Sequence, residues 1–176
     1  MFSYLVAILI IIGIYALLTQ ALNLQYGFAG LINFGLVGFF AIGAYASALV
    51  TLATHSFLAG FTSAIVLPAL AACPLALLAI RLRDDYFAIV TLGFGEIVRI
   101  VIVSEEWLTN GLRGLPGIPQ PFVFLGRGST ETAYLGLVLI CNVLALALVA
   151  RLTRSPFGRL IEAIRDDEVA ATTLGK

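Results

Sequence analysis

The chain has 176 residues, of which 61% are hydrophobic and only 11% are charged, whereas a soluble domain has about 45–50% apolar and about 25% charged residues. The ten Lys and Arg residues balance the ten Asp and Glu residues, so the net charge favours neither a nucleic-acid partner nor an acidic one. All of these charges lie at or after Arg81, and residues 1–80 contain no acidic or basic side chain other than His55. Such a segment excludes a soluble domain, a disordered chain and a coiled coil. The composition therefore predicts an integral membrane protein.

Long apolar runs, such as LVAILIIIGIYALL and LGLVLICNVLALALVA, favour spanning helices over a barrel, whose strands alternate polar and apolar residues. A helix needs about 20 mostly apolar residues to cross the hydrocarbon layer. We predict an all-α membrane bundle within residues 1–150, with an outer loop at 104–131 and a polar segment at 151–176. The predicted spans lie at about 4–22, 30–53, 57–80, 86–103 and 132–150, which makes about five.

Positive residues near the ends of spans indicate which loops face the cytoplasm. Arg81 and Arg83 lie between the third and fourth spans, and three arginines follow the fifth span. The two regions are separated by two spans, so they face the same side of the membrane, which we predict to be cytoplasmic. The loop at 104–131 and the N-terminus then face outward.

The second predicted span begins with an unusual concentration of small and polar residues in the stretch LNLQYGFAGLINFGLVGFFAIG. Glycines allow helix backbones to approach closely, so helix packing is one interpretation. The other interpretation is a discontinuous helix, whose freed backbone groups and Asn side chains line a translocation path. The residues predicted to form this path or helix break are Asn23, Gly27, Gly30, Asn33 and Gly35.

The fourth predicted span contains two opposite charges, Glu96 and Arg99, which are three residues apart and therefore share one helix face. Two charges near the centre of a span cost about 5–7 kcal/mol, and the Phe, Ile, Leu and Val residues of this span return about 3–7 kcal/mol. The span is thus marginal alone, and we expect the pair to face other helices. An ion pair that fixes helix packing and a direct part in transport both remain open.

The polar segment at 151–176 contains a predicted amphipathic helix that continues through Leu174. Ser155 followed by Pro156 is typical of a helix N-cap and first turn. The helix is too charged to span, so we expect it on the cytoplasmic side of the membrane. The acidic run 166–168 suits an anionic bilayer surface poorly, which favours a protein partner over an interfacial membrane helix. Its apolar residues at helical spacing are Phe157, Leu160, Ile161 and Ile164.

Four stretches resemble the M-type permease subunits of ATP-binding-cassette importers for branched-chain amino acids: YGFAGLINFGLVGFFAIGAYASAL, DDYFAIVTLGFGEIVRI, LTNGLRGLPGIP and SPFGRLIEAIRDDEVAATTLGK. They cover about half of the chain and follow the order of the family. In such importers a cytoplasmic helix of the permease docks on the ATPase subunit, and the matching region here is 154–175. The residues that the resemblance assigns to this coupling helix are Ser155, Pro156, Phe157, Gly158, Arg159, Ala163, Arg165, Asp166, Glu168, Ala170, Ala171 and Gly175.

The resemblance implies a multi-pass permease of the bacterial inner membrane with no catalytic residue, no metal and no cofactor of its own. The implied partners are cytoplasmic ATPase subunits that bind the ATP, a second permease subunit forming a heterodimer, and a periplasmic substrate-binding protein that faces the loop at 104–131. No G-x-x-x-x-G-K-[ST] sequence is present to hold a nucleotide. Members of this family normally continue with several more spans, so we expect a chain that stops at Lys176 to be a fragment or a truncated product.

Three other functions are alternatives to amino acid import. Permeases of urea and short-amide importers resemble this family closely, and the sequence does not separate the two substrates. A secondary carrier or channel is disfavoured because a salt-bridged glutamate is a poor proton carrier. A membrane enzyme is disfavoured because His55 has no acidic residue or cysteine near it in the sequence, while Cys73 and Cys141 lie in apolar spans, as buried structural thiols do.

Overall fold

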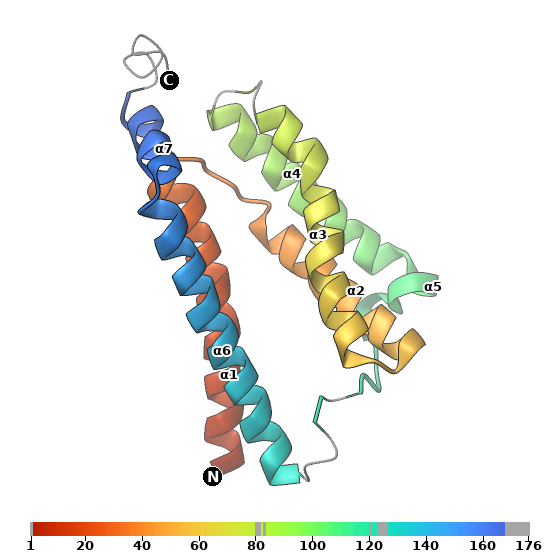
Figure 1. Cartoon of the computed structure of the whole chain (residues 1–176). Helices are drawn as coiled ribbons and strands as arrows, with labels where there is room; N and C mark the ends of the chain where they lie inside the picture. The colour runs from red at the N-terminus through yellow and green to blue at the C-terminus, as the bar shows by residue number, and fades with distance from the viewer. Residues whose placement is uncertain (1, 80–81, 83, 120, 123–126, 168–176) are drawn as a thin grey trace. The chain divides into compact units, whose positions relative to one another are not determined.

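The computed structural model describes residues 2–79, 82, 84–119, 121–122 and 127–167. Throughout these ranges the regular structure is helical (Figure 1). Five of the described helices are long and apolar enough to cross a membrane, which confirms the predicted all-α architecture and number of spans. These helices cover Ser3–Phe28, Leu36–Thr54, Phe57–Ala79, Tyr86–Ser104 and Ser129–Thr153.

The chain divides into two compact units, Met1–Leu31 with Phe122–Lys176 and Ile32–Pro121. In chain order the elements are α1 (Phe2–Leu22), the π-helix η1 (Asn23–Phe28), α2 (Leu36–Thr54), α3 (Phe57–Ala79), α4 (Asp84–Ser104), α5 (Glu106–Thr109), the 3₁₀-helix η2 (Gly111–Arg113), α6 (Arg127–Thr153) and α7 (Pro156–Asp166). The first unit therefore contains α1, η1, α6 and α7, and the second contains the other elements.

In the first unit α1 and α6 lie side by side and run in the same direction (Figure 1). The Asn142 side chain of α6 donates from Nδ2 to the carbonyl oxygen of Gly13 at 3.0 Å, and its Oδ1 accepts from Nε2 of Gln20 at 3.0 Å. A Cβ atom on Gly13 would overlap the Val138 side chain, so the glycine permits this close approach. Lipid gives helices no hydrophobic reason to associate, and packing and interhelical hydrogen bonds stabilise the pair instead.

A short turn separates α6 from α7, and the sequence of that turn determines where α7 begins. The hydroxyl of Ser155 accepts a hydrogen bond from the backbone N–H of Gly158 at 3.1 Å, and Pro156 occupies the first helical turn. Proline has no N–H to leave unpaired there, and the serine oxygen satisfies one of the free donors. The start of α7 is therefore the one that the Ser-Pro pair predicts.

The end of α7 differs from the sequence-based expectation. The helix ends at Asp166, and Asp167 has an extended backbone, so the predicted uninterrupted helix through Leu174 is wrong at this point. The physical reason is electrostatic, because carboxylates at the C-terminal end of a helix are repelled by the negative end of the helix dipole. The amphipathic pattern extends past the point at which these charges end the helix.

In the second unit α2 and α3 form an antiparallel hairpin, closed by a turn in which His55 adopts a φ of 52°. Small residues line the contact between the two helices. A Cβ atom on Gly60 would overlap the Thr51 hydroxyl and would lie 2.9 Å from the carbonyl oxygen of Ser47. Gly43 approaches the backbone of α3 almost as closely. The two backbones meet at distances that larger residues would prevent.

After α4 the chain passes through two short helices, α5 and η2, in the region predicted as an outer loop. The hydroxyl of Thr109 lies within hydrogen-bond distance of the carbonyl oxygens of Ile102 and Glu105, which fastens α5 to the end of α4. Asn110 then turns the chain with a φ of 61°. The helix that contains the fifth predicted span, α6, starts at Arg127, a few residues before the predicted residue 132.

Candidate functional site

The junction between the first two spans is irregular, as the glycines and asparagines of this region indicate. The first span ends in the π-helix η1, and the chain then stays outside any helix until α2 begins at Leu36. Asn23 and Gly27 lie in η1, where a Cβ atom on Gly27 would overlap the Asn23 side-chain oxygen. Gly30 has a φ of 72°, a conformation that glycine adopts at little cost. The break therefore precedes α2, and the helical part of the second span starts later than the predicted residue 30.

In the second unit the irregular segment rests on α4 through a buried threonine. The backbone N–H of Phe34 donates to Oγ1 of Thr91 at 3.1 Å, and Thr91 is completely buried. The Asn33 side chain accepts from the N–H of Gly35 at 2.8 Å. Sequence reasoning missed Thr91, because one threonine in an apolar run gives no periodic signal. The structure divides the predicted set, with Asn23, Gly27 and Gly30 in the first unit and Asn33 and Gly35 in the second.

Glu96 and Arg99 form a two-point ion pair on α4. Nε of Arg99 lies 2.9 Å from Oε2 of Glu96, and Nη2 lies 2.6 Å from Oε1. The Glu96 side chain is 53% exposed and that of Arg99 is 65% exposed. The pair borders a groove of about 380 Å³ between α2 and α4, where Gly38 faces Gly95. Charges within a span are costly against lipid, so a water-filled path or further protein has to cover them.

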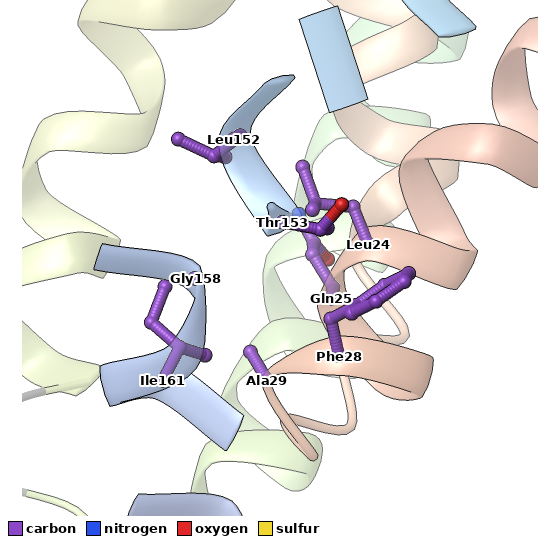
Figure 2. A pocket seen from close by; sticks show the side chains of 8 residues that line it. All are labelled: Leu24, Gln25, Phe28, Ala29, Leu152, Thr153, Gly158 and Ile161. Carbon is purple, nitrogen blue, oxygen red and sulfur yellow. The ribbon is translucent and has the colours of Figure 1, made fainter. Parts of the chain in front are cut away.

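A second hollow lies at the junction of η1, α6 and α7. Its volume is about 170 Å³, and apolar groups form nearly all of its surface (Figure 2). On the α7 side is Gly158, which is buried, and a Cβ atom there would overlap the carbonyl oxygen of Thr153. The side-chain oxygen of Gln25 is buried and has no hydrogen-bond partner among the described residues. The residues around the cavity are Leu24, Gln25, Phe28, Ala29, Leu152, Thr153, Gly158 and Ile161.

The last turn of α7 contacts η1 through the long side chain of Arg165. Nη1 of Arg165 donates to the carbonyl oxygen of Gly27 at 2.6 Å. The same guanidinium donates from Nε and Nη2 to Oδ1 of Asp166, at 3.0 Å and 2.7 Å. A Cβ atom on Gly30 would lie 2.7 Å from Cγ of Arg165, so only glycine leaves room for the arginine stem. The sequence predicted Arg165 and Gly30 in two different roles, and the structure places them in contact.

The rest of the predicted coupling helix is described only as far as residue 167. Phe157 and Ile164 are 58% and 42% exposed, although both are apolar. They are seven residues apart and therefore share one face of α7. The other exposed members of the predicted set are Pro156, Arg159, Ala163, Arg165 and Asp166. Glu168, Ala170, Ala171 and Gly175 lie outside the described residues.

Comparison with known proteins gives the family. A family model described as branched-chain amino acid transport system / permease component matches residues 4–176. The chain belongs to this permease family. The resemblance predicted from the four sequence stretches is thereby confirmed. With five helices able to cross a membrane, this family member is a multi-pass membrane protein.

Two bacterial members of the family and one archaeal member illustrate the match. The chain is 38% identical, over 92% of its length and 44% of theirs, to the high-affinity branched-chain amino acid transport system permease proteins LivM of Escherichia coli (strain K12) and Salmonella typhimurium (strain LT2). It is 25% identical, over 96% of its length and 59% of that protein, to the probable branched-chain amino acid transport permease protein LivM of Methanocaldococcus jannaschii. The chain thus spans about half the length of the curated relatives it matches. No solved structure matches it.

These relatives bear on the alternatives that the sequence left open. The first two relatives are named as branched-chain amino acid permeases and the third as a probable one, and none of the three names mentions urea or an amide. The family consists of transport subunits rather than enzymes. Within the described ranges no three His, Cys, Asp or Glu side chains gather as a metal site would require.

Proposed function

We propose that this chain contributes five membrane spans to the permease subunit of an ATP-binding-cassette importer in the bacterial inner membrane. The proposed substrates are branched-chain or other small amino acids. The observation that carries this proposal is the 38% identity over 92% of the chain to permeases named for that substrate class. Uptake of labelled leucine by cells that depend on this permease tests the substrate class. Excess isoleucine or valine is expected to compete, whereas competition by urea or acetamide alone would contradict the proposal.

ATP hydrolysis is assigned to a separate ATPase subunit, and α7 is the segment proposed to bind it. The helix is amphipathic, and the apolar face bearing Phe157 and Ile164 is exposed within the first unit. The N-terminal turn of α7 is held in place, because Ser155 caps this turn and Gly158 packs against the end of α6. A short, well-anchored helix with an exposed apolar face suits insertion into a groove of a partner protein.

Two further partners complete the proposed assembly. A second permease subunit would cover the exposed apolar flanks of the spans and the exposed charges of Glu96 and Arg99, which lipid alone covers poorly. A periplasmic binding protein would deliver the substrate to the opposite face, where the region 104–131 exposes Trp107 and Leu112. Large exposed apolar side chains of this kind are typical of interaction surfaces.

Co-purification of the permease with its ATPase tests the docking role of α7. Phe157→Ser combined with Ile164→Ser removes apolar surface from the proposed contact without touching the cap or the α6 junction. We expect the ATPase recovered with the permease to fall by about 10-fold or more, because central apolar anchors dominate such interfaces. Glu162→Gln, on the opposite side of α7, is the matched control and should leave recovery unchanged. Unchanged recovery with the double variant would contradict the docking role.

A further inference from the structure

The contact between Arg165 and Gly27 joins two parts of the chain that are 138 residues apart in sequence. One part is the last turn of α7, and the other is η1, the end of the first span. The contact is specific in two ways, because the guanidinium reaches the Gly27 carbonyl at 2.6 Å and the arginine stem lies over Gly30. A side chain at position 30 would displace it.

The chemistry of this contact is that of a helix C-terminal cap. The last carbonyl groups of a helix have no partner within it and carry the negative end of the helix dipole. An arginine guanidinium has five N–H donors in a rigid fork, so it can bind Asp166 with one edge and still donate to the Gly27 carbonyl. Arg165 therefore stabilises the end of the first span from a different segment of the chain.

The remainder of the boundary between α7 and η1 is loosely packed. Between the base of α7 at Gly158 and its last turn at Arg165 lies the cavity of about 170 Å³, lined on the η1 side by Leu24, Phe28 and Ala29. The helix is thus attached at two points, to α6 through Gly158 and to η1 through Arg165. The cavity therefore separates the two attachments.

We propose that Arg165 is a positioning residue that passes movement of α7 to the first span. Through the turn at Ser155 alone, movement of α7 would reach the first span only by way of α6 and its contacts with α1. With the second attachment, movement of α7 reaches the π-helical end of the first span directly. This inference rests on the proposed function, since it takes α7 as the helix that the ATPase moves. The mechanism is a rigid-body transfer through packed and hydrogen-bonded contacts.

The test uses the reconstituted complex of the permease with its ATPase. It measures ATPase binding separately from the coupling of ATP hydrolysis to transport. Arg165→Gln removes the charge and most of the reach. We expect unchanged recovery of the ATPase with the permease, and a fall of about 10-fold in substrate transported per ATP hydrolysed. Arg165→Lys keeps one cationic donor and should recover part of the loss. Arg151→Gln, at an exposed arginine in the last turn of α6 outside the predicted docking set, is the matched control and should have no effect.

A second variant on the other side of the contact makes the test specific. Gly30→Asn should lower the coupling ratio as Arg165→Gln does, because asparagine tolerates a positive φ but its Cβ displaces the arginine stem. The two changes act on one contact, so the double variant should be no worse than either single variant. Additive losses, normal coupling with Arg165→Gln, or a loss of coupling that parallels lost ATPase recovery would each overturn the inference.

A measurement on the permease alone distinguishes failure of this inference from failure of the proposed function. Amide hydrogen exchange near η1 reports the contact without the ATPase, because the N–H of Leu31 is bonded to the Gln25 carbonyl beside it. Arg165→Gln should speed exchange in this segment, and unchanged exchange would overturn the inference. If the unmodified permease recovers no ATPase at all, the proposed function fails instead.

Discussion

In the first unit α1 and α6 meet through the amide side chains of Asn142 and Gln20, whereas in the second unit α2 meets α3 and α4 at glycines. Both arrangements answer the same physical problem, since apolar surface gives helices no reason to associate in lipid. A hydrogen bond fixes which residues face each other, while a glycine contact fixes how closely the backbones approach. Substitutions of the amides between α1 and α6 should therefore act through lost hydrogen bonds, and substitutions of the glycines between α2 and α3 should act through steric overlap.

The largest effect is expected at Gly60, in the second unit. Gly60→Leu places a side chain where the Thr51 hydroxyl and the Ser47 carbonyl already lie. Overpacking of this kind costs about 1–3 kcal/mol and more where backbone must move. We expect the hairpin of α2 and α3 to open, seen as a loss of folded protein in detergent by size-exclusion chromatography. Gly136→Leu is the control, because no described atom outside the helix's own nearby backbone lies within 4 Å of a Cβ atom at that position. Equal yields for the two variants would contradict the steric account.

In the first unit the corresponding change is Asn142→Leu, which removes the hydrogen bonds to Gly13 and Gln20. Interhelical hydrogen bonds of this kind contribute about 0.6–2 kcal/mol in membranes, so the free energy of unfolding should fall by that amount. Denaturation in mixed micelles measures it. Gln20→Leu added to Asn142→Leu should cost little more, because the glutamine has already lost its partner. Fully additive losses would show that the two amides act independently.

Thr91→Val should have a smaller, local effect in the second unit. Valine keeps the shape of the side chain but leaves the N–H of Phe34 without its acceptor, a loss of about 1 kcal/mol. Faster amide exchange at Phe34 measures the effect. Thr91→Ser retains the hydroxyl and should preserve the protection. If both variants exchange alike, the hydroxyl does not hold the irregular segment on α4.

The smallest effect is expected at the start of α7. Ser155→Ala removes the oxygen that accepts from the N–H of Gly158, at a cost of about 0.5–1 kcal/mol for an exposed cap. The first turn of α7 should then exchange its amide hydrogens several-fold faster, while α6 remains unchanged. Ser155→Asp supplies another acceptor and should keep the turn protected. If Ser155→Asp also speeds amide exchange, the first turn depends instead on the hydrogen bond that the Ser155 hydroxyl donates to the carbonyl oxygen of Leu152.

Much of the fold could be predicted from the sequence because the signals are local. Apolar runs locate the five long helices, and the Ser155–Pro156 pair locates the start of α7. The predicted helix through Leu174 is interrupted at Asp167, because amphipathic spacing continues through the acidic residues that end α7 at Asp166. Local rules therefore predict where helices occur better than where they end.

The contacts of the candidate site could not be predicted in the same way. Asn142 and Thr91 are single polar residues in apolar runs, and their partners lie far away in the sequence. The sequence indicated that Arg165 and Gly30 matter, but as members of a docking helix and a helix break. Their contact depends on how α7 folds back toward η1, which no local pattern records. Glu96 and Arg99 are the exception, because their spacing of three alone places them together.

We propose that this chain works in an importer driven by ATP, and the energy source of transport tests this proposal most directly. The permease, co-reconstituted with its ATPase and binding protein in vesicles, should take up leucine only when ATP is supplied on the ATPase side. A proton gradient without ATP should drive no uptake. Uptake driven by the proton gradient alone, unaffected by ATP or by the ATPase, would contradict the account.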